Sequence, residues 1–228
     1  MIEGVVKFEA VHRTTALCAR TYGPLACRLA AWREILVKLG LVGRIPAAYD
    51  GAGFGNVSAR VGAPAAPRGA RSFLITGTQT GGLPCAGLDD LCLVRTYDWR
   101  RNRVNSEGPT QPSSESMTHG ALYDQGPHIR FVFHGHSPAL WGAAASLGLP
   151  VTDPSVPYGT PQMAEEVARL YCTTHLPSLG VFAMGGHEDG VVAFGRSPDE
   201  AGQALLLWLS RAYEAACGAS GAVCSTIR

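Results

Sequence analysis

The segment FVFHGHS places His134 and His136 two residues apart in an apolar run that is typical of a β-strand. Alternate side chains of a strand point to the same face, so both imidazoles project together while Phe131, Phe133 and Gly135 face the core. Two imidazoles in this arrangement can chelate a divalent cation. The pair on its own is equally compatible with two unrelated polar residues, and a third ligand is needed to favour a metal site.

His187 is the candidate for that third ligand. It lies in a turn between two strongly apolar segments, 181–185 and 190–195, where a loop can present a functional side chain. Three protein nitrogens that leave one position open are typical of a catalytic metal site. Glu188 and Asp189 follow His187, and two interpretations stay open. They orient an imidazole from behind, or they only form the turn, since Asp-Gly is common in hairpins.

Glu115 is the candidate proton-transfer residue. It belongs to the motif PSSE, which precedes an amphipathic run to Gln125 and looks like a capped helix start. A helix N-terminus stabilises negative charge, so a purely structural acid is the alternative. His119 lies four residues later on the same helical face. It either forms a second ligand pair with Glu115 or simply packs in the protein.

Two glycine-rich segments are candidates for anion binding. Residues 51–60 read GAGFGNVSAR, and residues 76–82 read TGTQTGG after a predicted strand. Glycine lets backbone N–H groups approach an oxyanion, and Asn, Ser and Thr add donors. Neither segment matches the dinucleotide pattern GxGxxG, and Walker A, HExxH and GxSxG motifs are absent. Each segment alone is more typical of an ordinary turn.

The surrounding elements predict an α/β fold with a mixed or antiparallel sheet flanked by helices, because strands and helices do not alternate strictly. Apolar spacing predicts helices over 17–39, 113–125, 139–147, 162–175 and 198–216, the last capped by Ser197. Strands are predicted over 72–76, 91–97, part of 99–108, 129–136, 181–185 and 190–195. Without repeats or linkers, residues 1–228 are expected to form one domain.

The composition is that of an ordinary globular protein. The chain has 228 residues, of which 46% are hydrophobic, and a formal net charge of +1. This balance gives no strong electrostatic case for nucleic acid or an anionic membrane, and Arg100, Arg101 and Arg103 are expected at a solvated hairpin tip. The seven cysteines form no CxxC pair and are expected to be reduced, in a cytoplasmic protein. No signal peptide or membrane span is expected.

The order of the motifs resembles the class II aldolase/adducin family. GNVS, ITGTQTGGL, PSSE, HGHS and a distal histidine before a strand follow one another within about residues 15 to 217. An ordered set is more specific than any one motif. The resemblance implies a single-domain α/β/α sandwich with a mainly antiparallel central sheet. It also implies a cytoplasmic homotetramer with active sites between neighbouring subunits.

The resemblance further implies a set of site residues. His134, His136 and His187 would bind a divalent metal, zinc first, with manganese, cobalt or iron(II) as alternatives. Glu115 would be the catalytic acid/base. The substrate phosphate would be held by five residues of the GNVS, ITGTQTGGL and PSSE motifs. These are Asn56, Gly77, Thr78, Ser113 and Ser114.

Three features depart from the family pattern. The distal histidine is usually followed by glycine, and here it is followed by Glu188. In the sugar-phosphate aldolases a tyrosine beyond the HxH pair assists the leaving hydroxyl, and this chain has Ser155 and Tyr158 in that region. A C-terminal tyrosine that enters the neighbouring active site has only Tyr213 as a weak counterpart.

The expected function is that of a metal-dependent lyase. It would break a carbon–carbon bond of a small, phosphorylated hydroxy-carbonyl compound, by retro-aldol cleavage or decarboxylation. The metal would act as Lewis acid and stabilise an enediolate, and Glu115 would return a proton to carbon. The expected partner is a sugar or keto-acid phosphate, without nucleic acid or membrane.

Alternative functions remain on the same scaffold. A sugar-phosphate 4-epimerase is disfavoured, because those relatives carry Asp where this chain has Glu115. A dehydratase or oxygenase stays open, since a fold does not fix a reaction. A non-catalytic adducin-like interaction module would lose the metal ligands, and this chain retains them.

Overall fold

An eight-stranded sheet forms the centre of the computed structural model, which describes residues 6–220. The strand order is β1-β7-β6-β5-β4-β8-β10-β9, and every pairing is antiparallel except that of β1 with β7. The strands are β1 (Glu9–Thr14), β4 (Asn56–Arg60), β5 (Phe73–Thr76), β6 (Leu91–Asp98), β7 (Arg103–Gly108), β8 (Phe131–His136), β9 (Val181–Ala183) and β10 (Gly190–Gly195). The expected mainly antiparallel α/β fold is confirmed.

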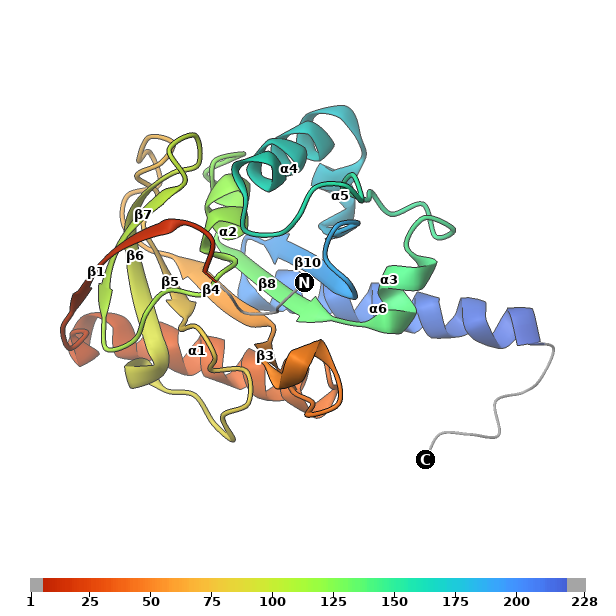
Figure 1. The fold of residues 1–228 in the computed structure, drawn as a ribbon, viewed down its shortest axis with the longest axis horizontal. Coiled ribbons are helices and arrows are strands. Elements are labelled where there is room, and N and C mark those ends of the chain that lie inside the picture. Colours follow the sequence, from red (N-terminus) through yellow and green to blue (C-terminus); the bar gives the residue numbers. More distant parts are fainter. Residues whose placement is uncertain (1–5, 221–228) are drawn as a thin grey trace.

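Helices cover both faces of this sheet (Figure 1). They are α1 (Ala19–Lys38), α2 (Ser116–Tyr123), α3 (Pro138–Ala143), α4 (Pro161–Thr173), α5 (Leu176–Leu179) and α6 (Pro198–Ser220). One apolar core joins α1, α3 and α6 to the sheet face that carries Phe131 and Phe133. A second core joins α2, α4 and α5 to the opposite face, which carries Val132. The alternation predicted for FVFHGHS is therefore confirmed.

Several helices begin as the sequence predicts. The Ser197 hydroxyl accepts the N–H of Glu200 at 3.0 Å and caps α6, with Pro198 in the first position. Ser137 accepts the N–H of Leu140 in the same way for α3. The helix predicted from residue 113 begins only at Ser116, because Ser113 and Ser114 precede its first turn.

Two other regions differ from the sequence prediction. Residues 51–60 are largely extended, not a loop: they contain β3 (Gly53–Phe54), which pairs with β2 (Gly43–Arg44), and then β4. β1 was not predicted, because its sequence EAVHRT is polar and mostly exposed along an edge of the sheet. Two 3-10 helices, η1 (Tyr49–Gly51) and η2 (Leu88–Asp90), complete the structure.

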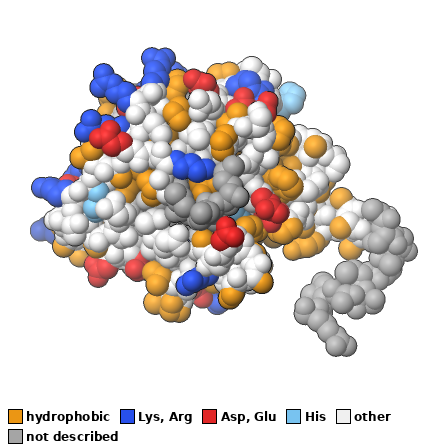
Figure 2. Space-filling model, viewed as in Figure 1, with side chains coloured by type: hydrophobic (Ala, Val, Ile, Leu, Met, Phe, Trp, Pro, Cys, Tyr) orange, Lys and Arg blue, Asp and Glu red, His pale blue; other side chains and the backbone are white. Residues whose placement is uncertain are grey.

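The surface carries both charges, and Lys and Arg side chains gather at the left of Figure 2, over the β1, β7 and β6 edge. Arg100 and Arg101 lie in the exposed turn between β6 and β7, as expected, whereas Arg103, expected there too, is the exposed first residue of β7. The cysteines that the structure describes carry free thiols, and Cys224 lies outside the described residues. None of the described helices has the length and apolar character needed to cross a membrane.

Candidate metal centre

Three histidines from two neighbouring elements meet at one end of the sheet. His134 and His136 lie near the end of β8, and His187 lies in the turn between β9 and β10. The antiparallel pairing of β10 with β8 sets Gly190 opposite His136 and thereby brings this turn to the HxH pair. One nitrogen of each ring lies within 4.8 Å of the others, and all three residues are buried. The structure thus brings together the three predicted ligands.

The chemistry of this donor set fits a divalent cation. His134 Nδ1 lies 3.1 Å from the carbonyl oxygen of Val191, which can only accept, so Nδ1 carries a proton and Nε2 is the nitrogen that has the lone pair in the neutral ring. Burial, and then the proximity of His134 and His187, lower the pKa of His136 well below 6.5. A neutral imidazole is the form that binds metal. Three such nitrogens suit zinc and its first-row neighbours.

Glu115 directs its carboxylate toward the histidines. It occupies the N-cap position of α2 but makes no side-chain capping bond. Its Oε1 lies 3.6 Å from His187 Nδ1, and its Oε2 accepts a hydrogen bond from the Thr118 hydroxyl at 2.7 Å. The residue is 1% exposed. These contacts favour a role beside the histidine cluster over that of a structural helix-start acid.

His119 does not pair with Glu115. Its Nδ1 lies 2.6 Å from the Ser58 hydroxyl, which also contacts the Tyr123 hydroxyl at 2.6 Å. Burial lowers the pKa of His119 well below its ordinary value, so the ring is neutral. His119 thus lies over β4, close enough to His134 for that residue also to lower its pKa, but its ring contacts Ser58 and not Glu115. Packing in a polar core network is therefore the interpretation that the structure supports.

The Asp189 carboxylate accepts a hydrogen bond from the Tyr49 hydroxyl at 2.6 Å. This contact connects the turn that carries His187 to η1. The group that orients an imidazole from behind is instead a backbone carbonyl, that of Val191 at His134. The interpretation of Asp189 as a carboxylate that only forms the turn is thus incomplete, because its side chain also connects two loops at the site.

The five predicted phosphate-binding residues line one small pocket next to the histidines. Pairing of β4 with β8 sets Asn56 opposite His134, and Asn56 Nδ2 donates to the Ser113 hydroxyl at 3.0 Å. The N–H groups of Gly77 and Thr78 donate to Asp90 and Gln111, so they already serve the fold. These two N–H groups are therefore not available to an anion in this structure.

Gly77 and Gly81 are required in this pocket for close approach. A Cβ at Gly77 would lie 2.3 Å from Thr110, and one at Gly81 would lie 2.6 Å from the carbonyl of Gly43. The glycine-rich pattern of residues 76–82 therefore allows tight packing against neighbouring segments. Its role as a source of free backbone donors, as the sequence suggested, is not supported at Gly77 or Thr78.

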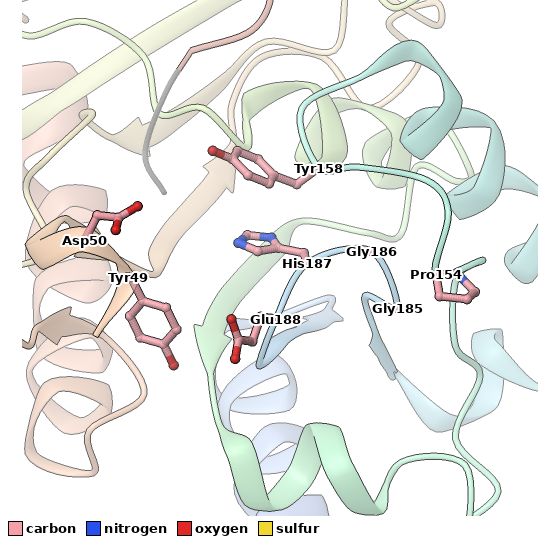
Figure 3. Close-up of a pocket in the computed structure, with 8 residues that line it drawn as sticks. All are labelled: Tyr49, Asp50, Pro154, Tyr158, Gly185, Gly186, His187 and Glu188. Atoms are coloured by element: carbon pink, nitrogen blue, oxygen red, sulfur yellow. The ribbon is translucent and has the colours of Figure 1, made fainter. Parts of the chain in front are cut away.

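A larger cavity of about 440 Å³ opens beside His187 (Figure 3). The Tyr158 ring stacks on the His187 ring with 4.4 Å between centroids, and Lys7 Nζ lies 3.5 Å from the Tyr158 centroid. Tyr49 and Asp50 line the opposite wall. Neither residue belongs to a sequence motif, and left-handed backbone at φ 53° and 55° brings them to the cavity.

The tyrosine candidates separate clearly. Tyr158 lies at the site, whereas the Ser155 hydroxyl donates to Asp153. Tyr213, which was expected to enter only a neighbouring subunit's site, is 56% exposed on α6, so that expectation stays a prediction. Tyr158 is thus the tyrosine that the described part of the chain brings to the histidine cluster from the region beyond β8.

One family of known proteins matches the sequence. The sequence model described as "Class II Aldolase and Adducin N-terminal domain" matches residues 47–215. None of the curated proteins is a significant match to the sequence.

Solved structures with the same fold include several whose titles name aldolases. YgbL from Escherichia coli, described as a putative aldolase/epimerase/decarboxylase, is 19% identical with a TM-score of 0.60, over 85% of this chain and 89% of that one. An L-fuculose 1-phosphate aldolase is 17% identical with a TM-score of 0.61, over 90% of each chain. A sugar-phosphate aldolase from Thermotoga maritima is 15% identical with a TM-score of 0.61, over 89% and 99%. At these identities the likeness establishes the fold.

Proposed function

The chain belongs to the class II aldolase and adducin family, and from this premise we propose that it is a metal-dependent lyase. Its substrate class would be small hydroxy-carbonyl compounds carrying a phosphate, cleaved at a carbon–carbon bond by retro-aldol reaction or decarboxylation. The observation that carries the proposal is the buried cluster of three histidines with Glu115 Oε1 3.6 Å from His187.

His134, His136 and His187 would hold the cation. Their fit rests on the lowered pKa of His136, on the orientation of His134 by Val191 and on the burial of all three residues. A bound divalent ion supplies a Lewis acid for a carbonyl oxygen and positive charge where the oxyanion develops. Zinc is the first choice for three imidazole nitrogens, and manganese, cobalt and iron(II) are alternatives.

Glu115 would carry the proton. Thr118 holds one carboxylate oxygen, and the other is directed to the histidines, so the group is oriented toward the place where a bound carbonyl compound would lie. In the cleavage direction it delivers a proton to the carbon from which the bond has broken, and in condensation it removes that proton. Its burial excludes bulk water from this transfer.

The substrate's anionic end would lie in the pocket of Asn56, Thr78, Ser113 and Ser114. The strand pairing of Asn56 with His134 supports this, since the pocket lies beside one of the three histidines. A phosphate held there by hydroxyl and amide donors would present the adjacent carbonyl to the histidine cluster. Tyr158, which stacks on His187, is our candidate for assisting the leaving hydroxyl.

Two finer statements accompany the proposal. We expect a homo-oligomer, a tetramer by family resemblance, in the cytoplasm. An adducin-like interaction module is the second candidate, and it is disfavoured because such a role needs neither three buried histidines nor a buried Glu115.

A substrate screen tests the proposed function. The purified protein, loaded with zinc or cobalt, is incubated with ketose 1-phosphates such as L-fuculose 1-phosphate and with 3-keto acid phosphates. Release of a triose phosphate or of carbon dioxide is measured with and without chelator. We expect turnover of at least one class, lost on chelation. A fully metal-loaded protein that cleaves neither class would contradict the proposal.

A further inference from the structure

A second cavity, of about 650 Å³, lies away from the candidate metal centre. Its volume is in the range of small-molecule sites. None of the described residues that line it is acidic, and five are arginines: Arg28, Arg60, Arg95, Arg130 and Arg196. The chain as a whole has a formal net charge of only +1, so positive charge is concentrated locally at this cavity.

This cavity lies at the other end of the strands that carry the metal centre. Asn56 begins β4 and Arg60 ends it, which at about 3.3 Å per residue separates them by about 13 Å. Arg130 directly precedes β8, whose far end carries the histidines, and Arg196 follows β10. The arginine-lined cavity is therefore distinct from the pocket of Ser113 and Ser114.

Arg60 brings a buried positive charge to the wall of this cavity. It is 2% exposed, and its Nη2 donates to the carbonyls of Ala63 and Pro64. Its Nε and Nη1 are buried and have no hydrogen-bond partner among the described residues. Guanidinium groups stay protonated and have five donors. Because Nε and Nη1 are enclosed, they do not reach the cavity, and Arg60 adds only its positive charge beside a lining in which no described residue is acidic.

The other arginines reinforce this charge. Arg95 is paired with Glu107, so its charge is balanced. Arg28, Arg130 and Arg196 form no ion pair with the residues that the structure describes. Arg130 donates to the Arg60 carbonyl, and the Arg28 guanidinium lies 5.6 Å from the Phe131 ring centroid. Several charges thus face one space without a protein counter-ion.

The remaining lining suggests what the anion is attached to. Apolar and aromatic surface comes from Leu25, Val61, Tyr22 and Phe131, and hydroxyl groups come from Thr21 and Ser72. Arginine forks bind phosphate oxygens in a bidentate manner, and aromatic rings stack on flat groups. We propose that this cavity binds a small molecule that combines a phosphate with a flat apolar group, with the chemistry of a nucleoside monophosphate. The proposal does not depend on the proposed lyase function.

Titration calorimetry with adenosine monophosphate tests the proposal on the full-length protein. The test variant is the double substitution Arg28→Gln/Arg196→Gln, because both side chains are exposed and can be changed without opening the core. The matched control is Arg100→Gln/Arg101→Gln, which changes the net charge equally at the exposed β6–β7 turn. Ser113→Asp reports whether binding takes place at the metal-centre pocket instead.

We expect one binding site, a dissociation constant at least tenfold higher in Arg28→Gln/Arg196→Gln, and no such change in the control or in Ser113→Asp. Inorganic phosphate should compete with the nucleotide, more weakly than the nucleotide binds. Absence of binding at millimolar nucleotide, or binding lost in Ser113→Asp and kept in the cavity variant, would overturn the proposal. If the double variant does not fold, Arg196→Gln alone is expected to weaken binding in the same direction, and unchanged affinity there counts against the cavity.

Discussion

Replacing Glu115 by Gln separates a proton-transfer residue from a structural one. The substitution keeps the size of the side chain and its ability to accept the Thr118 hydroxyl, but removes the group that takes up the proton. General acid–base catalysis contributes about 10²–10⁴-fold to turnover, which is about 2.7–5.5 kcal/mol in the activation free energy. We therefore expect kcat to fall by at least two orders of magnitude, with metal content unchanged.

The expected effect on stability is much smaller. Glu115 makes no capping bond, so the contribution to α2 that is lost is the interaction of its charge with the helix dipole. That interaction stabilises a helix by about 0.3–1 kcal/mol, which for a chain of this size shifts Tm by about 1–4 °C. Turnover and thermal melting are measured on the same preparation.

Glu200→Gln is the matched control for this experiment. It makes the same chemical change at an exposed acid in the first turn of α6, where the carboxylate accepts the N–H of Arg196. We expect full turnover and a similarly small change in Tm. Glu115→Gln with near-normal turnover and a lowered Tm would refute the catalytic assignment and support the helix-start alternative.

Three further predictions follow from the site and its surroundings. Ser113→Asp should raise KM for a phosphorylated substrate at least tenfold and leave metal content unchanged, since the new negative charge lies beside the Asn56 donor. An unchanged KM would refute the assignment of this pocket to the substrate phosphate. Gly186→Ala should lower the free energy of unfolding by about 1–3 kcal/mol through overpacking, because the new Cβ would lie 2.0 Å from the Val156 carbonyl oxygen. Gly142→Ala is the control: its Cβ would have no atom within 4 Å, so urea denaturation should show little loss of stability. The metal-free protein should lose stability as the pH falls below 6.5. The pKa of His119 is lowered in the folded chain, so between the two pKa values only the unfolded chain binds a proton at this residue. His119 should therefore reduce the free energy of unfolding by up to about 1.4 kcal/mol per pH unit. His119→Gln should reduce that slope without abolishing it, because the pKa of His136 is also lowered in the folded chain. An equal slope in the two proteins would show that His119 is not responsible.

The metal ligands could be predicted from the sequence because strand periodicity alone puts His134 and His136 on one face. His187 could be proposed only as a loop residue, since its position depends on the pairing of β10 with β8, which links residues far apart in the chain. The main helices follow apolar spacing and N-capping residues, so their prediction was largely correct.

The rest of the site depends on tertiary contacts that local patterns do not contain. Tyr49 and Asp50 enter the cavity through a left-handed turn of a short segment with no motif of its own. The spacing of Glu115 and His119 suggested a pair, but Glu115 is at the N-cap and turns to the histidines, while His119 binds Ser58. Arg60, at the end of a buried strand, carried no sequence signal of an anion site.

The central claim is that His134, His136 and His187 bind one divalent metal, and cobalt titration followed by visible absorption tests it most directly. The account predicts about one equivalent of cobalt per chain, with the absorption bands of a low-symmetry, four- or five-coordinate ion. Each single His→Ala substitution at the three positions should reduce binding strongly, and His175→Ala, at an exposed histidine, should not. Full, tight cobalt occupancy in all three single variants would contradict the account.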